Sequence, residues 1–182
     1  MNNENEKLTD SSVDNTVTKS KKPSVKSTTK FIARTGVICA LYTALTLAFS
    51  AISYGPIQVR VSEALTILPL FCVEAIPALA LGCFLSNIQT GIWDMVIGTL
   101  ATLIAGVLTR VFKKFYFGVI PPIVINALLI PIIFLTIPDI TTAYWFNALT
   151  VGAGQAISVC GLGIPLYFAL KKANSRYPKL FN

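Results

Sequence analysis

Histidine is absent from this chain of 182 residues. Histidine is the commonest metal ligand in proteins and the commonest general acid or base near neutral pH. Its absence also removes the Ser/His and Cys/His pairs with which hydrolases activate a nucleophile. A GxxxxGK[ST] phosphate loop is missing as well, which excludes ATP hydrolysis by that route. We therefore expect a protein that is not an enzyme, with no metal ion and no cofactor.

Charged residues are the second scarcity. They make up 13% of the chain, whereas 54% of the residues are hydrophobic and the mean hydropathy is +0.68. Soluble domains typically have a charged fraction of about 25%. The composition therefore predicts an integral protein of the cell membrane. At about 20 residues per spanning helix, the length leaves room for roughly six helices and no separate soluble domain.

The chain has four cysteines, and their spacing carries no signature of a metal or redox site. The four residues lie in apolar runs, and no two of them form a CxxC pair. They are Cys39, Cys72, Cys83 and Cys160. We interpret them as small core residues and expect no disulfides.

Residues 1–34 differ in composition from the rest of the chain. They have seven basic and four acidic side chains and almost no large apolar residues, so we predict a disordered cytoplasmic tail. A loose hold on anionic lipid headgroups is the alternative. The apolar run at 35–53 is too long for the core of a signal peptide, and we predict an uncleaved first helix there. The predicted organisation is a tail at 1–34, a six-helix membrane domain at 35–172 and a cytoplasmic C-terminal tail at 173–182.

Basic residues define the topology. They gather in three places: before the first apolar run, around Arg110, and after Leu170. Such clusters belong on the cytoplasmic side of a membrane. An even number of crossings must therefore separate each cluster from the next. The apolar blocks number five, and three of them lie between the first two clusters, which would put those clusters on opposite sides. The blocks are 35–53, 64–88, 93–111, 117–135 and 146–170.

The block at 64–88 resolves this conflict if it crosses the membrane and returns. Pro69 and Pro77 flank a natural turn at residues 72–74. The prediction is an all-α membrane protein with six transmembrane helices and both termini in the cytoplasm. Its second and third helices are short, so a re-entrant hairpin of the same parity is the alternative.

Few polar side chains lie in or beside the predicted spans. After Arg34 the only acidic residues are Glu63, Glu74, Asp94 and Asp139. In the predicted topology Arg60, Glu63, Asp94 and Asp139 fall at the outer boundary, while Asn87, Asn126, Asn147 and Gln155 lie between that boundary and the middle of the membrane. Amide groups inside a membrane are costly unless paired, so they face the bundle interior. We predict a polar cavity open to the outside; hydrogen bonding between helices is the alternative use of these amides.

Small residues recur on two predicted helices. Gly36, Ala40, Ala44 and Ala48 are four residues apart on the first helix, and Gly98, Thr102 and Gly106 are four apart on a later one. Such faces let helices approach closely, either inside the bundle or against another protein. The pattern leaves both uses open.

Several motifs resemble those of the QueT family of queuosine precursor transporters. They are Tyr-Gly-Pro-Ile-Gln-Val-Arg-Val-Ser-Glu-Ala-Leu at 54–65, Asn87 with Gly91, Trp93-Asp94, Gly-Thr-Leu-Ala-Thr-Leu at 98–103, and Pro-Pro-Ile-Val-Ile-Asn-Ala at 121–127. The resemblance covers about residues 35–170. It departs at Gln155, where family members often have an acid.

The resemblance implies a role as the substrate-binding S component of an energy-coupling factor (ECF) transporter. Such components are six-helix proteins that capture a vitamin-like molecule and dock on a transmembrane T component driven by two ATPase subunits. It implies that Ala40, Ala44 and Ala48 form the docking surface. Besides these partners and the lipid bilayer we expect a small-molecule substrate and no nucleic acid.

The implied ligand is a 7-deazaguanine, whose adjacent N–H donors suit a carboxylate and whose flat face suits an aromatic ring. Glu63 or Asp94 is the expected acceptor. Trp93 and Tyr54 are the expected stacking residues, unless they belong to the aromatic belt of the membrane interface. We expect Asn87, Asn126 and Gln155 to contact substrate. For Arg60 the alternatives are shaping the mouth of the site, an ion pair with Glu63, or a lipid phosphate contact.

Two other functions fit the same residues. One is a small gradient-coupled carrier that acts alone on a purine-like or cationic molecule. The other is a purely structural membrane subunit. Co-purification with T and ATPase subunits distinguishes the S component from the carrier, which would transport in isolation.

Overall fold

The computed structural model describes residues 25–54, 58–112, 114–135 and 144–177. Within these ranges the chain forms helices and their connections, without a strand. The prediction of an all-α protein is confirmed. The tail up to residue 24 and the connection that contains Asp139 lie outside the described residues.

Four stretches of the described chain are long and apolar enough to cross a membrane: Thr28–Ala48, Ile92–Phe112, Phe115–Ile133 and Tyr144–Arg176. The first belongs to α1 (Val25–Ala48), and the second is α4 (Ile92–Phe112). The third runs through α5 (Phe115–Gly118), α6 (Ile120–Leu129) and part of α7 (Pro131–Leu135). The fourth joins α8 (Tyr144–Ala156), the π-helix η2 (Ile157–Gly163) and α9 (Ile164–Arg176). These stretches agree with four of the five apolar blocks.

The remaining block forms the predicted hairpin. A 3₁₀ helix, η1 (Val61–Leu70), is followed by a turn and by α3 (Ala75–Ser86), and the turn includes residues 72–74 as expected. The two helices have 10 and 12 residues, which is fewer than the roughly 20 of a full crossing. The hairpin is confirmed, while the count of six crossings stays a prediction.

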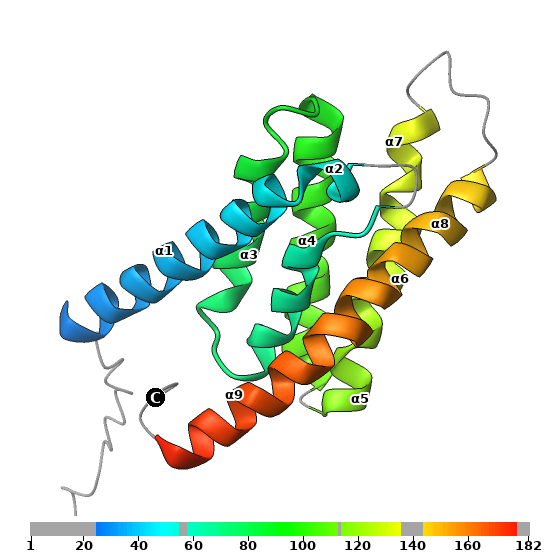
Figure 1. The fold of residues 1–182 in the computed structure, drawn as a ribbon. Coiled ribbons are helices and arrows are strands. Elements are labelled where there is room, and N and C mark those ends of the chain that lie inside the picture. The colour runs from blue at the N-terminus through cyan, green and yellow to red at the C-terminus, as the bar shows by residue number, and fades with distance from the viewer. Residues whose placement is uncertain (1–24, 55–57, 113, 136–143, 178–182) are drawn as a thin grey trace, which may run out of the picture.

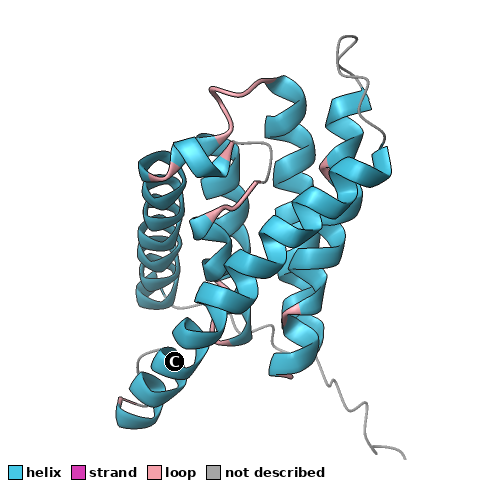
Figure 2. Ribbon diagram, turned by 45° about the vertical axis from the view of Figure 1, so that its right-hand side comes forward, coloured by secondary structure: helices cyan, strands magenta, loops and turns pink. Residues whose placement is uncertain are grey.

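The helices surround η1. Residues 62–69 of η1 are all buried, and η1 packs against α1, α3, α4, η2 and α9. Around it α1 packs on α3, α3 on α4, α4 on α6, and α6 on α8. Figure 1 shows α1 along one side of this bundle and α6 to α8 along the other, with the short α2 (Ser50–Ser53) after the end of α1. Figure 2 shows the long α8–α9 helix from a second side. The charged segment at 60–63 thus begins an element enclosed by protein.

The N-terminal helix begins earlier than the composition predicts. It starts at Val25, so the expectation of disorder is wrong for residues 25–34. Lysine and arginine are good helix formers, and Arg34 at the end of this extension forms an ion pair with Glu74 on the η1–α3 turn. The C-terminal boundary is also displaced, because α9 continues through Ala173 to Arg176.

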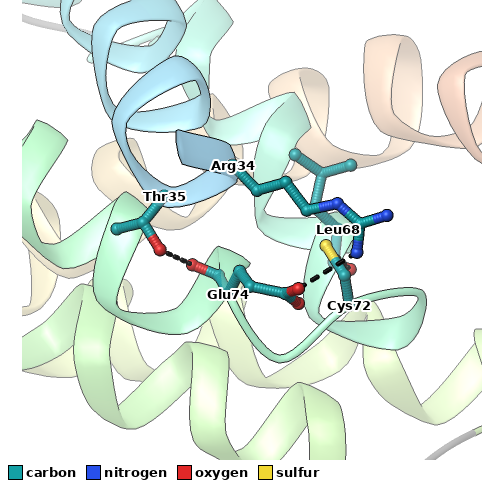
Figure 3. Close-up of polar contacts among 5 residues, drawn as sticks. All are labelled: Arg34, Thr35, Leu68, Cys72 and Glu74. Carbon is teal, nitrogen blue, oxygen red and sulfur yellow. Dashed lines mark hydrogen bonds and ion pairs between the residues drawn. The ribbon is translucent and has the colours of Figure 1, made fainter. Parts of the chain in front are cut away.

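The η1–α3 turn is held from two sides. Arg34 donates to the Glu74 carboxylate at 3.1 Å, and Thr35 donates to the Glu74 carbonyl at 3.5 Å (Figure 3). From α4, Arg110 donates to the carbonyl oxygens of Pro69 and Leu70 at 3.1 and 3.3 Å. These bonds satisfy backbone groups that the end of a helix leaves open. They also tie the turn to α1 and α4.

These contacts place two of the three basic clusters at one end of the bundle, and an apolar contact places the third there. Arg34 represents the N-terminal cluster, and Arg110 the middle one. The third cluster follows Leu170, which packs against the apolar group that contains Leu68 and Cys72 near the turn. This arrangement is what the topology argument requires.

The two small-residue faces have different surroundings. Gly98 and Gly106 are buried, and a Cβ added to Gly106 would meet Ile76 of α3 at ordinary contact distance, 3.8 Å. The stripe on α1 formed by Gly36, Ala40, Ala44 and Ala48 is exposed along its whole length. The face on α4 therefore packs inside the protein, whereas the α1 stripe does not.

The four cysteines are free thiols. Cys39, Cys72 and Cys83 are buried, as their apolar surroundings predict. Cys160 is exposed, so the prediction of a core position is wrong there. It lies on η2, whose residues are small or apolar on every side. The sequence therefore does not distinguish the outward face of this helix from the inward one.

Candidate functional site

A group of buried polar side chains lies at the beginning of η1. Arg60 immediately precedes this helix, and Glu63 lies in its first turn. Tyr42 from α1, Tyr54 from the segment after α2, and Asn87 from the end of α3 contact one or the other. We call these five residues the polar cluster.

Glu63 is held by α1. Its side chain is 1% exposed, and its Oε1 accepts a hydrogen bond of 2.6 Å from the Tyr42 hydroxyl. One turn along α1, the Thr46 hydroxyl is hydrogen-bonded to the Ser62 hydroxyl at 2.7 Å. Two successive residues of η1 are therefore tied to two residues on one face of α1.

Arg60 is held by α3 and by Tyr54. Its Nη2 donates to Asn87 Oδ1 at 2.5 Å, and its guanidinium carbon lies 5.3 Å from the centre of the Tyr54 ring. The contact with the ring is a cation–π interaction. Arg60 is 6% exposed, which argues against a lipid phosphate contact. In the described structure it does not form the alternative direct ion pair with Glu63.

Asn87 has partners for both ends of its amide. Its Oδ1 accepts from Arg60, and its Nδ2 donates to the backbone carbonyl of Asp94 at 3.2 Å. A Cβ on Gly98 would lie 2.7 Å from this Nδ2, so glycine is needed for the close approach of α3 and α4. Asn87 therefore orients Arg60 and ties it to the beginning of α4.

The two expected aromatic residues have different environments. Tyr54 faces Arg60, and its hydroxyl donates to the Ser86 carbonyl at 2.7 Å. Trp93, next to Asp94 in the first turn of α4, is 56% exposed. One face of Tyr54 is thus taken up by an internal contact. Trp93 remains accessible.

Asn126 on α6 and Gln155 on α8 are buried, at 2% and 4% exposure. Their helices meet closely, since a Cβ on Gly152 would lie 3.3 Å from Ala127. Beside Gln155, Gly154 abuts the backbone of Gln58, where an added Cβ would lie 2.8 Å from the carbonyl carbon. The chain at 58–60 therefore links this pair to the polar cluster.

Five buried polar atoms have no hydrogen-bond partner among the described residues. They are Ser53 Oγ, Arg60 Nε, Glu63 Oε2, Asn126 Nδ2 and Gln155 Oε1. Such atoms are rare in folded proteins, because each one costs about 1–3 kcal/mol when it is buried unpaired. Four of the five belong to candidate site residues of the sequence analysis.

The depth of the site differs from the expectation of an outer boundary. Glu63 contacts Tyr42, which lies near the middle of the apolar run 35–53. The chain enters the bundle before η1 begins: Val59 donates to the Ile52 carbonyl at 3.1 Å, and Gln58 lies against Gly154. A count of residues along the sequence does not reveal this inward path.

The sequence interpretation missed Tyr42, Thr46 and Ser62. Tyr42 and Thr46 are four residues apart, so they share one face of α1, and both are completely buried. A hydroxyl-bearing pair with helical spacing in an apolar helix is the signal that could have identified them. As for metals, no group of three potential ligands among His, Cys, Asp and Glu comes together in the described ranges.

The arrangement of these helices and side chains can be compared with known proteins. The family model described as QueT transporter matches residues 32–172, which include every residue of the polar cluster. The chain belongs to the QueT transporter family. This confirms the resemblance seen in the motifs. It makes the chain a multi-pass membrane protein from a family of transporters, not of enzymes.

A related protein, the queuosine precursor transporter QueT of Lactococcus lactis subsp. cremoris (strain MG1363), is 43% identical over 99 residues. The aligned region covers 50% of this chain and 59% of the relative. The chain thus spans less than two thirds of the length of this relative. No solved structure matches the chain significantly.

Proposed function

We propose that this QueT family member is the substrate-binding S component of an ECF importer that takes up queuosine precursors, which are 7-deazaguanines. The substrate named for the Lactococcus lactis relative supports the ligand class. The proposed binding site comprises Arg60, Glu63, Asn87 and Tyr54 of the polar cluster, together with Trp93, Asp94, Asn126 and Gln155. Six crossings with cytoplasmic termini complete the proposal, supported by the three basic clusters that share one end of the bundle.

The unpartnered polar atoms carry this proposal. Glu63 Oε2 and Gln155 Oε1 are acceptors, whereas Arg60 Nε and Asn126 Nδ2 are donors. A 7-deazaguanine has N–H donors on its Watson–Crick edge and acceptors at its carbonyl oxygen and ring nitrogen. Bound beside these groups, it would satisfy atoms that are otherwise costly to bury.

The proposed roles follow from the contacts of each side chain. Glu63 accepts a hydrogen bond from the N–H donors of the ligand. Arg60, Asn126 and Gln155 form hydrogen bonds with its remaining polar atoms. Asn87, whose amide is already satisfied, holds Arg60 in place. Trp93 and Tyr54 supply stacking surfaces, and Asp94 lies at the edge of the site, where its carbonyl anchors Asn87.

The first test is ligand binding by the purified protein. Isothermal titration calorimetry with a queuosine precursor of the 7-deazaguanine class should give saturable binding, and Glu63→Gln should weaken the affinity about ten- to a hundredfold. This is the loss expected when a charge-assisted hydrogen bond is removed from a desolvated donor. Glu74→Gln is the matched control, because Glu74 lies at the turn outside the site. An equal affinity of wild type and Glu63→Gln would refute the proposed site.

The exposed stripe on α1 supports the proposed docking to a T component. Ala40, Ala44 and Ala48 are exposed, so they are not used in packing the bundle. A row of small residues allows another helix to approach closely. The resemblance to S components assigns this row to the T component, which two ATPase subunits drive.

The second test separates docking from binding. Ala44→Leu places a bulky side chain in the stripe, and Ala153→Leu places the same bulk at an exposed position of α8. We expect only Ala44→Leu to lose the T component in pull-downs and to lose ATP-dependent uptake, with ligand affinity unchanged. Normal assembly and uptake by Ala44→Leu would contradict the docking surface. Uptake by the isolated chain in liposomes would favour the stand-alone carrier.

A further inference from the structure

Tyr42 is a buried tyrosine that contacts the proposed site without being among its expected residues. It is 0% exposed and belongs to the apolar group that includes Leu65 and Leu79. Its ring lies against Gly82 of α3, where an added Cβ would come within 2.8 Å of the Tyr42 Cβ. The ring therefore has little freedom to move, and the position of its hydroxyl is set by α1 and α3.

This hydroxyl determines how Glu63 is oriented. The bond to Oε1 has a length of 2.6 Å, which is typical of a hydroxyl that donates to a carboxylate. The other carboxylate oxygen, Oε2, is the one without a partner in the described structure. Rotation of the carboxylate would break the bond to Tyr42, so the two oxygens have distinct roles.

The neighbouring hydroxyl contacts strengthen this arrangement. Thr46 bonds Ser62 at 2.7 Å, which fixes the backbone position from which the Glu63 side chain extends. Arg60 does not compete for the carboxylate, because its guanidinium is engaged with Asn87 and Tyr54. Tyr42 is thus the group that holds Glu63.

We propose that Tyr42 is a positioning residue that holds Glu63 Oε1 so that Oε2 is presented to the exocyclic amino N–H of the substrate. This inference rests on the proposed function. Tyr42 does not contact the substrate. It sets the selectivity for ligands that bear the exocyclic amino group of a guanine-like ring. A carboxylate that is held through one oxygen binds a donor at a fixed position more tightly than a freely rotating carboxylate does.

A double-mutant cycle tests the proposal. The variants are Tyr42→Phe, Glu63→Gln and the double variant. Each is titrated with 7-cyano-7-deazaguanine and with 7-cyano-7-deazahypoxanthine, which differs from it only in lacking the amino group. Tyr42→Phe keeps the ring and removes the hydroxyl. We expect it to weaken binding of the amino-bearing ligand about tenfold and to reduce the preference over the ligand without the amino group by a similar factor.

The second half of the cycle distinguishes positioning from independent effects. If Tyr42 acts through Glu63, Tyr42→Phe should change affinity by less than about twofold in the Glu63→Gln background. Thr43→Val is the matched control. It removes another α1 hydroxyl, whose hydrogen bond of 3.3 Å goes to the Gly82 carbonyl and not to η1. Its affinity and selectivity should equal those of wild type.

Each outcome decides a defined question. The positioning role would be overturned if the affinity loss of the double variant equals the product of the two single losses. It would also be overturned if Tyr42→Phe weakens binding of both ligands equally. Failure of wild type to bind either ligand would overturn the proposed function and this inference with it. If Tyr42→Phe does not purify, Gly82→Ala displaces the same ring and must give the same loss of selectivity; unchanged selectivity there overturns the inference.

Discussion

Gly154→Ala tests the close approach of α8 to the chain that leads into the site. Gly154 is buried, and a Cβ there would lie 2.8 Å from the carbonyl carbon of Gln58. Carbon atoms in proteins pack at about 3.5–4.0 Å. The obstacle is backbone, so it cannot rotate away as a side chain would. Either α8 or the segment before Arg60 must move.

The expected magnitude combines two opposing effects. Alanine is favoured over glycine inside a helix by about 1 kcal/mol, while overpacking costs about 1–3 kcal/mol. Because backbone must shift, we expect the upper end of that cost and a net loss of about 2 kcal/mol. In a protein of this size this lowers the melting temperature by about 4–8 °C.

The matched control is Gly161→Ala on the same long helix. A Cβ on Gly161 meets nothing within 4 Å, so only the helix preference acts and the melting temperature should stay equal or rise. Thermal unfolding of both variants and wild type, followed by circular dichroism in one detergent, gives the comparison. Equal melting temperatures for the two variants would refute the close approach at Gln58.

Two further predictions concern the turn and the cluster. Burial favours the neutral form of Glu74, but hydrogen bonds from its own backbone and from Arg34 outweigh this and hold the pKa of the carboxyl below its usual 4.5. The pair therefore stabilises the fold above pH 4.5, and that stability is lost as the pH falls through the lowered pKa. Glu74→Gln should reduce the free energy of unfolding at pH 7 by about 1 kcal/mol or less; a difference from wild type that persists unchanged at strongly acidic pH contradicts this. Gly98→Ala should push Asn87 from Arg60 and weaken ligand binding severalfold in titration calorimetry. Gly106→Ala, with ordinary contacts at 3.8 Å, is its control, and equal affinities would argue against the role of Asn87.

The membrane class and the hairpin could be predicted because they depend on local composition. Apolar runs define helices regardless of their neighbours, and Pro69 and Pro77 restrict where the chain can reverse. Arg60 and Glu63 stood out for the same reason, since charges beside apolar runs are rare. The parity of the basic clusters then demanded a return within 64–88, and the chain does return there.

Other features depend on contacts between distant segments. The bond between Tyr42 and Glu63 joins residues 21 positions apart in the sequence, and no local pattern encodes that meeting. The start of α1 at Val25 likewise depends on partners such as Glu74, which favour helix where composition favours disorder. The inward path of residues 58–60 depends on Gly154 of α8, which lies almost a hundred residues later in the sequence. These features required the assembled structure.

The 3₁₀ geometry of η1 determines the thickness of the barrier below the proposed site. A 3₁₀ helix advances about 2.0 Å per residue, compared with about 1.5 Å for an α-helix. Beyond Glu63, residues 64–69 are buried and lead to the end of the bundle where Arg34 and Arg110 bond the turn. These six residues thus extend about 12 Å, which is less than half of the roughly 30 Å of a hydrocarbon core. A substrate bound beside Glu63, as we propose, would be separated from that end by this short segment, and its passage would require displacement of η1 and not the opening of a long channel.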